Sequence, residues 1–243
     1  MRTLRAGELT VRVTGGTDRE GGGSGPLVVL LHGYGAPGDD LVPLFRVLDV
    51  PREVRFAFPE APLEPPELAA FGGRAWWPID MIALQRAAAE GRARDRTGET
   101  PAGLLPAREQ LDAALEALTR ELDVPEGQLV LGGFSQGAML AIDVALQTKR
   151  PLAGLILLST TLLCRDVWQP LMAARAGLPV LQTHGLQDPL LSHAIALELR
   201  DLWLTAGAKL EWLEFRGGHE LPNSVLDALG RFIRAVVEVR SFD

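Results

Sequence analysis

The amino-acid sequence predicts an α/β fold with a mostly parallel central sheet, in a single domain that spans residues 1–243. Two patterns lead to this prediction: short apolar runs alternate with longer amphipathic stretches, and several runs are apolar without interruption, such as LVVLL at 27–31. Uninterrupted apolar runs are typical of strands covered on both faces. The alternation of strand and helix implies parallel strands joined by crossover helices. A length of 243 residues suits one α/β domain or two small ones.

The expected elements follow one another along the whole chain. The expected strands are Leu9–Val13, Leu27–Leu31, Val54–Phe58, Leu129–Gly133, Gly154–Leu158, Val180–Thr183 and Leu210–Phe215. Apolar residues at helical spacing predict helices at Ala107–Leu122, Ser192–Leu204 and Ser224–Val239, and the apolar stretch Ala138–Leu146 predicts a buried helix. Ligands bind beyond the carboxyl ends of the strands in such sheets, so functional residues are expected directly after strands.

Two segments between these elements are long. Gly15–Pro26 is rich in glycine and is expected to form a flexible hairpin or a surface loop. Pro59–Gly103 contains no expected strand, only a helical piece around Met81–Glu90, and a segment of this length is usually functional or disordered. We expect this insert, residues 59–103, to border the active site. Whether its part from 81 to 103 forms a lid stays open.

Composition and charge exclude several classes of function. The net charge of −7 argues against a nucleic-acid partner, because phosphate binding needs clustered Lys and Arg. Cys164 is the only cysteine, so a disulfide within the chain is impossible. The sequence shows no signal-peptide pattern and no apolar run of bilayer length, which predicts a cytoplasmic protein without stable membrane insertion. The oligomeric state stays open, a homodimer included.

A serine between glycines is the first candidate for chemistry. Gly133-Phe134-Ser135-Gln136-Gly137 matches the pattern G-x-S-x-G, after an expected strand and before an expected helix. In that context the chain turns sharply, the serine backbone is strained, and a Cβ at either glycine would clash. The turn also places the hydroxyl at the positive end of a helix, where an oxyanion is stabilised. The alternative is a serine that caps the helix after a glycine turn.

A nucleophilic serine needs a base and an acid that orients the base, in the chain order Ser, Asp or Glu, His. His219 lies in a glycine-containing loop directly after the strand Leu210–Phe215, where a general base is expected. Asp188 follows the strand before it and is the expected acid, unless it only shapes the turn before Pro189.

The rival candidates are less well placed in the sequence. His184 ends a strand and is expected to be a wall residue, although it could also be a base, and His193 is expected at the surface. The rival acids are Asp166, which starts a helix, and Glu220, which is adjacent to the base and poorly placed to orient it.

The segment LVVLLHGYGAPGDDL, residues 27–41, supplies the expected second half of an oxyanion hole. Backbone N–H groups after this strand can point at the substrate oxygen together with the N–H that follows the nucleophile. We expect the donors to be the backbone N–H groups of Tyr34 and Gln136. Gly33 and Gly35 permit the backbone angles that the turn requires. His32 is expected to hold this loop and not to act as a second base.

The motifs LHGYGAPGDD, GGFSQGAMLA, HGLQDP and GGHE together resemble the family of small carboxylesterases, lysophospholipases and acyl-protein thioesterases. The resemblance covers nearly all of the chain from Leu27 onward. It implies an α/β-hydrolase fold with helices on both faces of the sheet, and a Ser135-Asp188-His219 catalytic triad. GRAWWPID is similar to a tryptophan-containing segment of that family, which implies that Trp76 and Trp77 line the substrate site; a core-packing aromatic pair is the alternative. Tyr34 departs from the leucine-like residue usual there.

The function expected from these residues is hydrolysis of carboxylic esters, thioesters or lysophospholipids through an acyl-enzyme on Ser135. Its partner would be a small-molecule acyl substrate, with no metal and no organic cofactor. The alternative from another class is a catalytically inactive module that binds a hydrophobic ligand in the same fold. A related hydrolase of lactones or peptides is a third hypothesis. The natural substrate and its acyl-chain length stay open.

Overall fold

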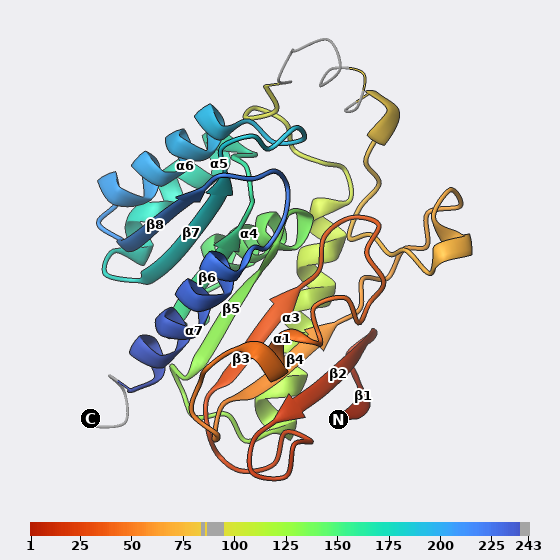
Figure 1. The fold of residues 1–243 in the computed structure, drawn as a ribbon, viewed down its shortest axis with the longest axis vertical. Coiled ribbons are helices and arrows are strands. Elements are labelled where there is room, and N and C mark those ends of the chain that lie inside the picture. Colours follow the sequence, from red (N-terminus) through yellow and green to blue (C-terminus); the bar gives the residue numbers. More distant parts are fainter. Residues whose placement is uncertain (84–85, 87–94, 239–243) are drawn as a thin grey trace.

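The computed structural model describes residues 1–83, 86 and 95–238. Its eight-stranded sheet has the strand order β1-β2-β4-β3-β5-β6-β7-β8 (Figure 1). β1 and β2 pair antiparallel, β2 is also antiparallel to β4, and all pairs from β4 to β8 are parallel. The strands are β1 (Arg2–Ala6), β2 (Leu9–Gly15), β3 (Leu27–Leu31), β4 (Arg55–Pro59), β5 (Leu129–Phe134), β6 (Gly154–Leu158), β7 (Pro179–Gly185) and β8 (Lys209–Phe215). The predicted α/β class with a mostly parallel sheet is confirmed.

The sequence analysis missed β1, while every strand that it expected is present with ends shifted by at most two residues. β1 lies at the edge of the sheet and pairs only with β2. Only Ala6 of its five residues is buried. An edge strand of this kind needs little apolar sequence, so its pattern does not stand out from that of a polar terminus.

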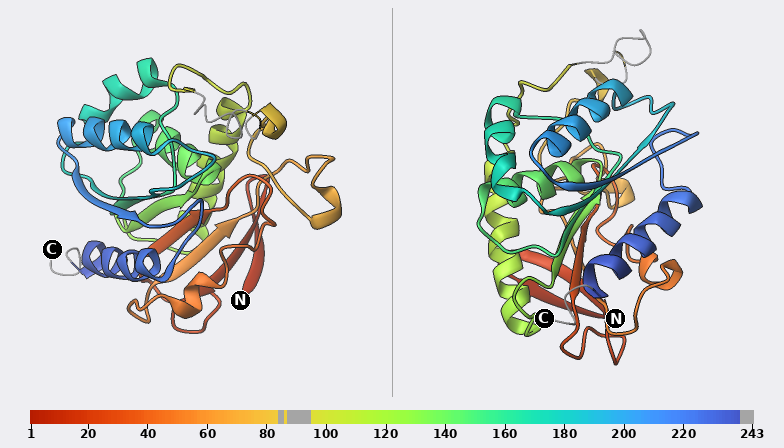
Figure 2. Two further views of the ribbon diagram at one scale, coloured as in Figure 1. Left: turned by 45° about the horizontal axis from the view of Figure 1, so that its top comes forward. Right: turned by 90° about the vertical axis from the view of Figure 1, so that its left-hand side faces the viewer.

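Helices cover both faces of the sheet, as predicted (Figure 2). α3, α4, α5 and α6 pack on one face, and α1 and α7 on the other. All four predicted helices are present, except that Val239 lies outside the described residues. Of the helical piece expected around Met81–Glu90, Met81–Ala83 and Arg86 are helical, and the rest lies outside the described residues. The helices are α1 (Leu44–Val47), α3 (Leu104–Glu121), α4 (Gln136–Gln147), α5 (Arg165–Met172), α6 (His193–Thr205) and α7 (Asn223–Glu238), with short 3-10 turns at Ala69–Phe71 and Ala173–Arg175.

The central strands are apolar at every position because successive side chains enter two different cores. In β3, Leu27, Val29 and Leu31 pack toward α3 and α4, whereas Val28 and Leu30 pack toward α1 and α7. All five side chains are at most 1% exposed. This double burial explains the uninterrupted run LVVLL, which a sheet with one solvated face would not need.

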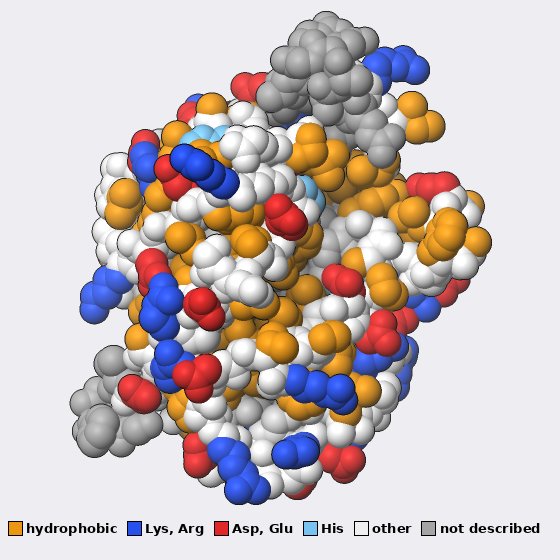
Figure 3. Space-filling view, in the orientation of Figure 1, with side chains coloured by type: hydrophobic (Ala, Val, Ile, Leu, Met, Phe, Trp, Pro, Cys, Tyr) orange, Lys and Arg blue, Asp and Glu red, His pale blue; other side chains and the backbone are white. Residues whose placement is uncertain are grey.

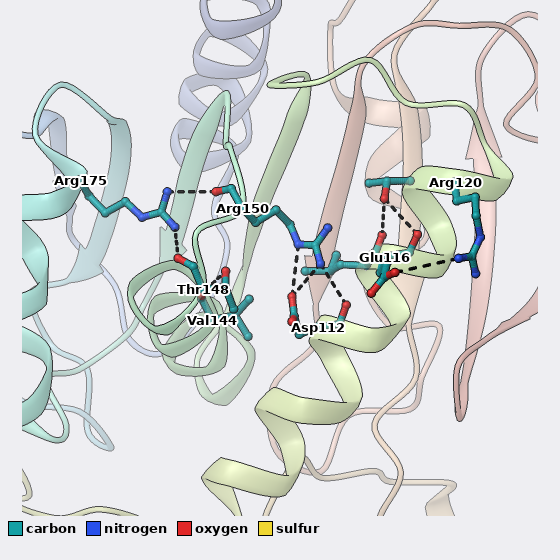
Figure 4. Close-up of polar contacts among 9 residues, drawn as sticks. Asp112, Glu116, Arg120, Val144, Thr148, Arg150 and Arg175 are labelled. Carbon is teal, nitrogen blue, oxygen red and sulfur yellow. Dashed lines mark hydrogen bonds and ion pairs between the residues drawn. The ribbon is translucent and has the colours of Figure 1, made fainter.

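Two arginines hold the carboxyl-terminal end of α4 (Figure 4). Arg175 donates hydrogen bonds to the carbonyl of Thr148 at 2.6 Å and to that of Arg150 at 3.0 Å. The side chain of Arg150 in turn forms an ion pair with Asp112 of α3 at 2.7 Å. Cations at this end of a helix satisfy carbonyls that have no partner within the helix. α4 is thus fixed at the end opposite to the one that follows Ser135.

The outer surface carries charges of both signs. Acidic and basic side chains are interspersed on the face seen in Figure 3. Among the described residues, no helix has both the length and the apolar character needed to cross a bilayer.

The glycine-rich loop predicted at Gly15–Pro26 joins β2 to β3, and the buried side chain of Arg55 holds it through hydrogen bonds to its carbonyl groups. The Arg55 side chain is fully buried. Its guanidinium donates to the carbonyl of Gly23 at 2.8 Å and to those of Gly25 and Leu122. A single buried cation therefore ties the loop to the carboxyl-terminal end of α3, whose last carbonyls need donors.

Replacing Arg55 tests this fastening. We expect Arg55→Met to lower the free energy of unfolding by at least about 2 kcal/mol, because the carbonyls that it binds lose their donor inside the protein. Urea denaturation followed by circular dichroism measures the change. The matched control is Arg52→Met, since Arg52 is exposed and, among the described residues, makes one hydrogen bond, of 3.3 Å, to the Thr17 carbonyl. The control should change stability by no more than about 0.5 kcal/mol; equal losses in both variants would contradict the assignment.

Candidate active site

Ser135 lies at the sharp turn between β5 and α4. Its backbone angles are φ 53° and ψ −118°, a conformation that costs a non-glycine residue about 1–3 kcal/mol. The turn is held by the Ser135 N–H, which donates to the Leu158 carbonyl of β6 at 2.9 Å, and by the Met139 N–H, which donates to the Ser135 carbonyl at 3.1 Å. The strained turn predicted from the sequence is confirmed.

The two flanking glycines are required by the packing of this turn against β3. A Cβ on Gly133 would lie 2.6 Å from the backbone of Gly137 and 2.6 Å from the Leu31 carbonyl oxygen. A Cβ on Gly137 would lie 2.2 Å from that same oxygen and 2.6 Å from the His32 carbonyl oxygen. Real Cβ atoms do not approach backbone atoms so closely, so the predicted clash at both positions is confirmed.

Asp188 and His219 form the closest side-chain contact at the carboxyl ends of β7 and β8. His219 Nδ1 lies 2.6 Å from Asp188 Oδ2, a short charge-assisted hydrogen bond. The other carboxylate oxygen, Oδ1, accepts from the N–H groups of Leu190 and Leu191, both at 2.9 Å. The Asp188 side chain is fully buried and that of His219 is 13% exposed. The carboxylate is therefore fixed on both sides, and the imidazole that it orients still reaches the surface.

The loops that carry these two residues are themselves paired. The Leu186 N–H donates to the Phe215 carbonyl at 2.9 Å, and the Gln187 N–H to the Gly217 carbonyl at 2.9 Å. These bonds continue the pairing of β7 with β8 beyond the ends of the strands. The contact between Asp188 and His219 is thus a consequence of strand register.

The imidazole of His219 packs on the ring of Phe134, with ring centroids 4.7 Å apart. Phe134 directly precedes Ser135, so this contact brings His219 to the serine turn. Within the described part of the chain the Ser135 hydroxyl has no hydrogen-bond partner. Its approach to His219 stays a prediction.

The surroundings of Asp188 favour its charged form. Burial raises the pKa of this carboxyl group, but the hydrogen bond and charge of His219 and the two backbone N–H groups outweigh burial, so the pKa lies below its ordinary value. His184 Nε2 is 3.7 Å from the same carboxylate oxygen, but this histidine is fully buried and burial lowers its pKa. His184 therefore stays neutral and leaves the carboxylate to His219.

The rival candidates occupy other surroundings. His184 donates through Nε2 to the Leu191 carbonyl at 3.1 Å and so braces the acid loop, as expected of a wall residue. His193 starts α6 and contacts Glu214. Asp166 lies in the first turn of α5, and Glu220 accepts from the Gly218 N–H. Among the described residues, neither of these carboxylates binds His219.

The loop after β3 carries the other expected oxyanion donor. Gly35 has φ 80°, and its N–H donates to the Arg74 carbonyl at 2.8 Å. The Tyr34 hydroxyl donates to Glu67 at 2.8 Å, and burial together with this bond raises the Tyr34 pKa to about 12. The backbone N–H groups of Tyr34 and Gln136 donate to no described residue, which leaves both free for a ligand.

His32 holds this loop, as predicted. The Ala61 N–H donates to His32 Nε2 at 3.1 Å, so the ring proton is on Nδ1, which donates to the Gly33 carbonyl at 2.9 Å. Burial lowers the pKa of His32, so the ring is neutral. A neutral histidine with both nitrogens bonded is not free to act as a base.

Trp76 and Trp77 lie in the hydrophobic core, with only 2% and 1% of each residue exposed. This burial favours the core-packing alternative, and a role in lining the substrate site stays a prediction. The sequence analysis assigned Gln136 only a backbone role and missed its side chain, which bonds to the backbone of both tryptophans. A polar residue inside an otherwise apolar helix turn is the signal that could have drawn attention to it.

No metal centre accompanies this cluster in the described residues, where no group of three or more His, Cys, Asp or Glu side chains is arranged to hold a metal ion. The arrangement offers the half-buried Ser135 at its strained turn, a carboxylate-oriented imidazole and two N–H groups that have no acceptor among the described residues, all at one edge of the sheet. Such a set can support nucleophilic acyl transfer.

Comparisons with known proteins show which family the chain matches. The chain matches the family described as Phospholipase/Carboxylesterase over residues 20–237. Acyl-protein thioesterase 1 of Neurospora crassa is 29% identical over 216 residues, which cover 85% of this chain and 84% of that protein. Acyl-protein thioesterase 1 of Cryptococcus neoformans is 30% identical over 172 residues, 68% of this chain and 67% of that protein.

Solved structures share the fold. The crystal structure of esterase PE8 has a TM-score of 0.77 and 28% identity, with 94% of this chain and 99% of that chain covered. The carboxylesterase of Bacillus cereus has a TM-score of 0.70 and 20% identity, with 94% of each chain covered. The predicted α/β-hydrolase fold is confirmed by these structures.

The depressed pKa of Asp188 predicts a pH-dependent contribution to stability. A carboxylate with a pKa below its ordinary value of 3.8 stabilises the folded state above that pH, and the contribution disappears as the pH falls through the folded-state pKa. We expect Asp188→Asn to be less stable than the wild type at about pH 7, with a difference that shrinks below about pH 4. Urea titrations across this range measure it. The control is Asp227→Asn on the exposed side of α7; a pH-independent difference for Asp188→Asn would contradict the prediction.

Proposed function

The chain belongs to the phospholipase/carboxylesterase family, and we propose that this carboxylic ester hydrolase uses Ser135 as nucleophile, His219 as general base and Asp188 as the acid that orients the base. The observation that carries the proposal is the contact of His219 with Phe134, because it brings a carboxylate-bound imidazole to the residue before a serine in a strained turn. Two observations support it. A side chain at Gly133 or Gly137 would clash with backbone atoms, and His219 is partly exposed.

The proposed reaction proceeds through an acyl-enzyme. His219 takes the Ser135 proton as the hydroxyl oxygen attacks the carbonyl carbon, and it then gives this proton to the leaving alcohol or thiol. In the second half His219 activates a water molecule that releases the acid. Asp188 holds the proton-bearing Nδ1 of His219, which turns the other ring nitrogen toward the reaction and stabilises the imidazolium.

The oxyanion that forms would be bound by the N–H groups of Tyr34 and Gln136. Gln136 is the first residue of α4, so its N–H has no acceptor within the helix and lies at the positive end of the helix dipole. The loss of one such donor typically costs about 10²–10³-fold in kcat. Tyr34 and Gln136 thus contribute through their backbone N–H groups. A tyrosine at position 34 in place of the leucine-like residue usual in the family therefore leaves the donor in place.

The proposed substrates are small acyl esters, with thioesters and lysophospholipids as further members of the class. Two relatives are named acyl-protein thioesterase 1, which supports a thioester activity for this chain. We also propose that the insert at 59–103 borders the site. In support, Glu67 binds the Tyr34 hydroxyl, and Arg74 pairs with the loop through the Gly35 N–H. A series of p-nitrophenyl esters and acyl thioesters of increasing chain length measures the preference.

Ser135→Ala tests the nucleophile. We expect it to lower kcat for p-nitrophenyl butyrate by several orders of magnitude, about 10⁶-fold by analogy with subtilisin, and to abolish labelling by a fluorophosphonate probe. The control is Ser159→Ala, because Ser159 also follows a strand with a positive φ, of 46°, but is fully buried. The control should retain labelling.

The same experiment separates the enzyme from the binding module. A wild-type protein that binds hydrophobic ligands but neither reacts with the probe nor hydrolyses the ester would favour the inactive module. Labelling that persists in Ser135→Ala would assign the nucleophile elsewhere.

A further inference from the structure

The side chain of Gln136 joins two segments that are far apart in the sequence. Gln136 is fully buried at the start of α4, directly after Ser135. Its Oε1 accepts from the Trp76 N–H at 3.0 Å, and its Nε2 donates to the Trp77 carbonyl at 2.8 Å. A backbone N–H can only donate and a carbonyl can only accept, so these partners fix the orientation of the amide. Both ends of the side chain are used.

The connection continues from Trp76 to the loop after β3. The indole Nε1 of Trp76 donates to the His32 carbonyl at 3.0 Å, and the two rings lie 5.6 Å apart. His32 in turn donates to the carbonyl of Gly33, the residue before Tyr34. A series of buried hydrogen bonds therefore runs from Gln136 through Trp76 and His32 to the Gly33 carbonyl, which belongs to the same peptide group as the Tyr34 N–H.

This series connects the two residues whose N–H groups would bind the oxyanion. The donors lie on different loops, one after β3 and one after β5, yet both must point at one oxygen from about 2.7–3.1 Å. Parallel pairing of β3 with β5 fixes the strands, but the pairing ends at Leu31 and Gly133, before either donor. Beyond that point the bonds through Trp76 provide the link.

We propose that the Gln136 side chain is a positioning residue that, through Trp76 and His32, sets the distance between the Tyr34 and Gln136 N–H groups. This inference rests on the proposed function. Correctly spaced N–H donors stabilise the negative charge that develops on the substrate oxygen in the transition state. Because this interaction is weak in the ground state, misplaced donors lower kcat and leave KM nearly unchanged. A displacement of about 1 Å can cost about 10²-fold in rate.

Gln136→Met removes both hydrogen bonds while keeping the size and shape of the side chain. We expect kcat to fall about 10–10²-fold, with KM within about twofold of the wild type. The matched control is Gln182→Met: Gln182 is also fully buried, but it lies in β7 and its side chain bonds to the Ala196 carbonyl of α6. The control should lose stability and retain kcat. Equal kcat for Gln136→Met and the wild type would overturn the inference.

Gln136→Glu gives a readout that a merely structural role would not produce. A protonated carboxyl group can accept from the Trp76 N–H and donate to the Trp77 carbonyl, as the amide does, whereas the ionised form cannot donate. Burial raises the pKa of a carboxyl group toward neutrality. We expect the ratio of kcat in Gln136→Glu to kcat in the wild type to rise as the pH falls from about 9 to about 6. Taking the ratio at each pH removes the pH dependence that the variant shares with the wild type.

These outcomes differ from a failure of the proposed function. If the wild type shows no hydrolysis that depends on Ser135, the proposed function fails before Gln136 is examined. If the wild type is active and Gln136→Met does not fold, the inference is tested by the pH dependence of the ratio of kcat in Gln136→Glu to kcat in the wild type. A ratio that is independent of pH would overturn the inference while leaving the catalytic assignment intact.

Discussion

The structure depends on the close approach of the serine turn to β3. The Leu31 carbonyl oxygen lies only 2.6 Å from where a Cβ on Gly133 would be and 2.2 Å from where one on Gly137 would be, so strand and turn touch through backbone atoms. This contact lets α4 leave the sheet steeply enough to hold Ser135 in its strained conformation, and the arginines at the other end of α4 keep the helix in that position. The strain is tolerated because the surrounding strands over-determine the turn.

Parallel pairing then decides which residues meet. β3, β5, β7 and β8 run in one direction, so the residues that follow them lie at one edge of the sheet. Tyr34, Ser135, Asp188 and His219 each follow one of these strands. Residues as far apart in the sequence as Tyr34 and His219 thus lie at one edge of the sheet. The bonds between the last two loops hold Asp188 and His219 in register.

Much of this could be predicted from the sequence, because the signals are local. Uninterrupted apolar runs gave the buried strands, and the glycines around Ser135 reflect a clash between backbone atoms that any such turn would have. The edge strand β1 was missed because only Ala6 is buried. The side-chain bonds of Gln136 were missed because they join residues 60 positions apart, and no periodicity in the sequence reports such a contact.

The surroundings of Asp188 show how one carboxylate can serve two purposes. Oδ1 of Asp188 accepts two backbone N–H groups, which fixes the loop and its own orientation, and Oδ2 is left for His219. Were His184 charged, it would compete for Oδ2 from 3.7 Å, but burial lowers the pKa of His184 and outweighs its bond to the Leu191 carbonyl, which by itself would raise that pKa. Of the two histidines near the carboxylate, the one that retains contact with solvent is therefore the one that is hydrogen-bonded to it. Burial as well as distance thus separates the structural histidine from the one that we propose as the general base.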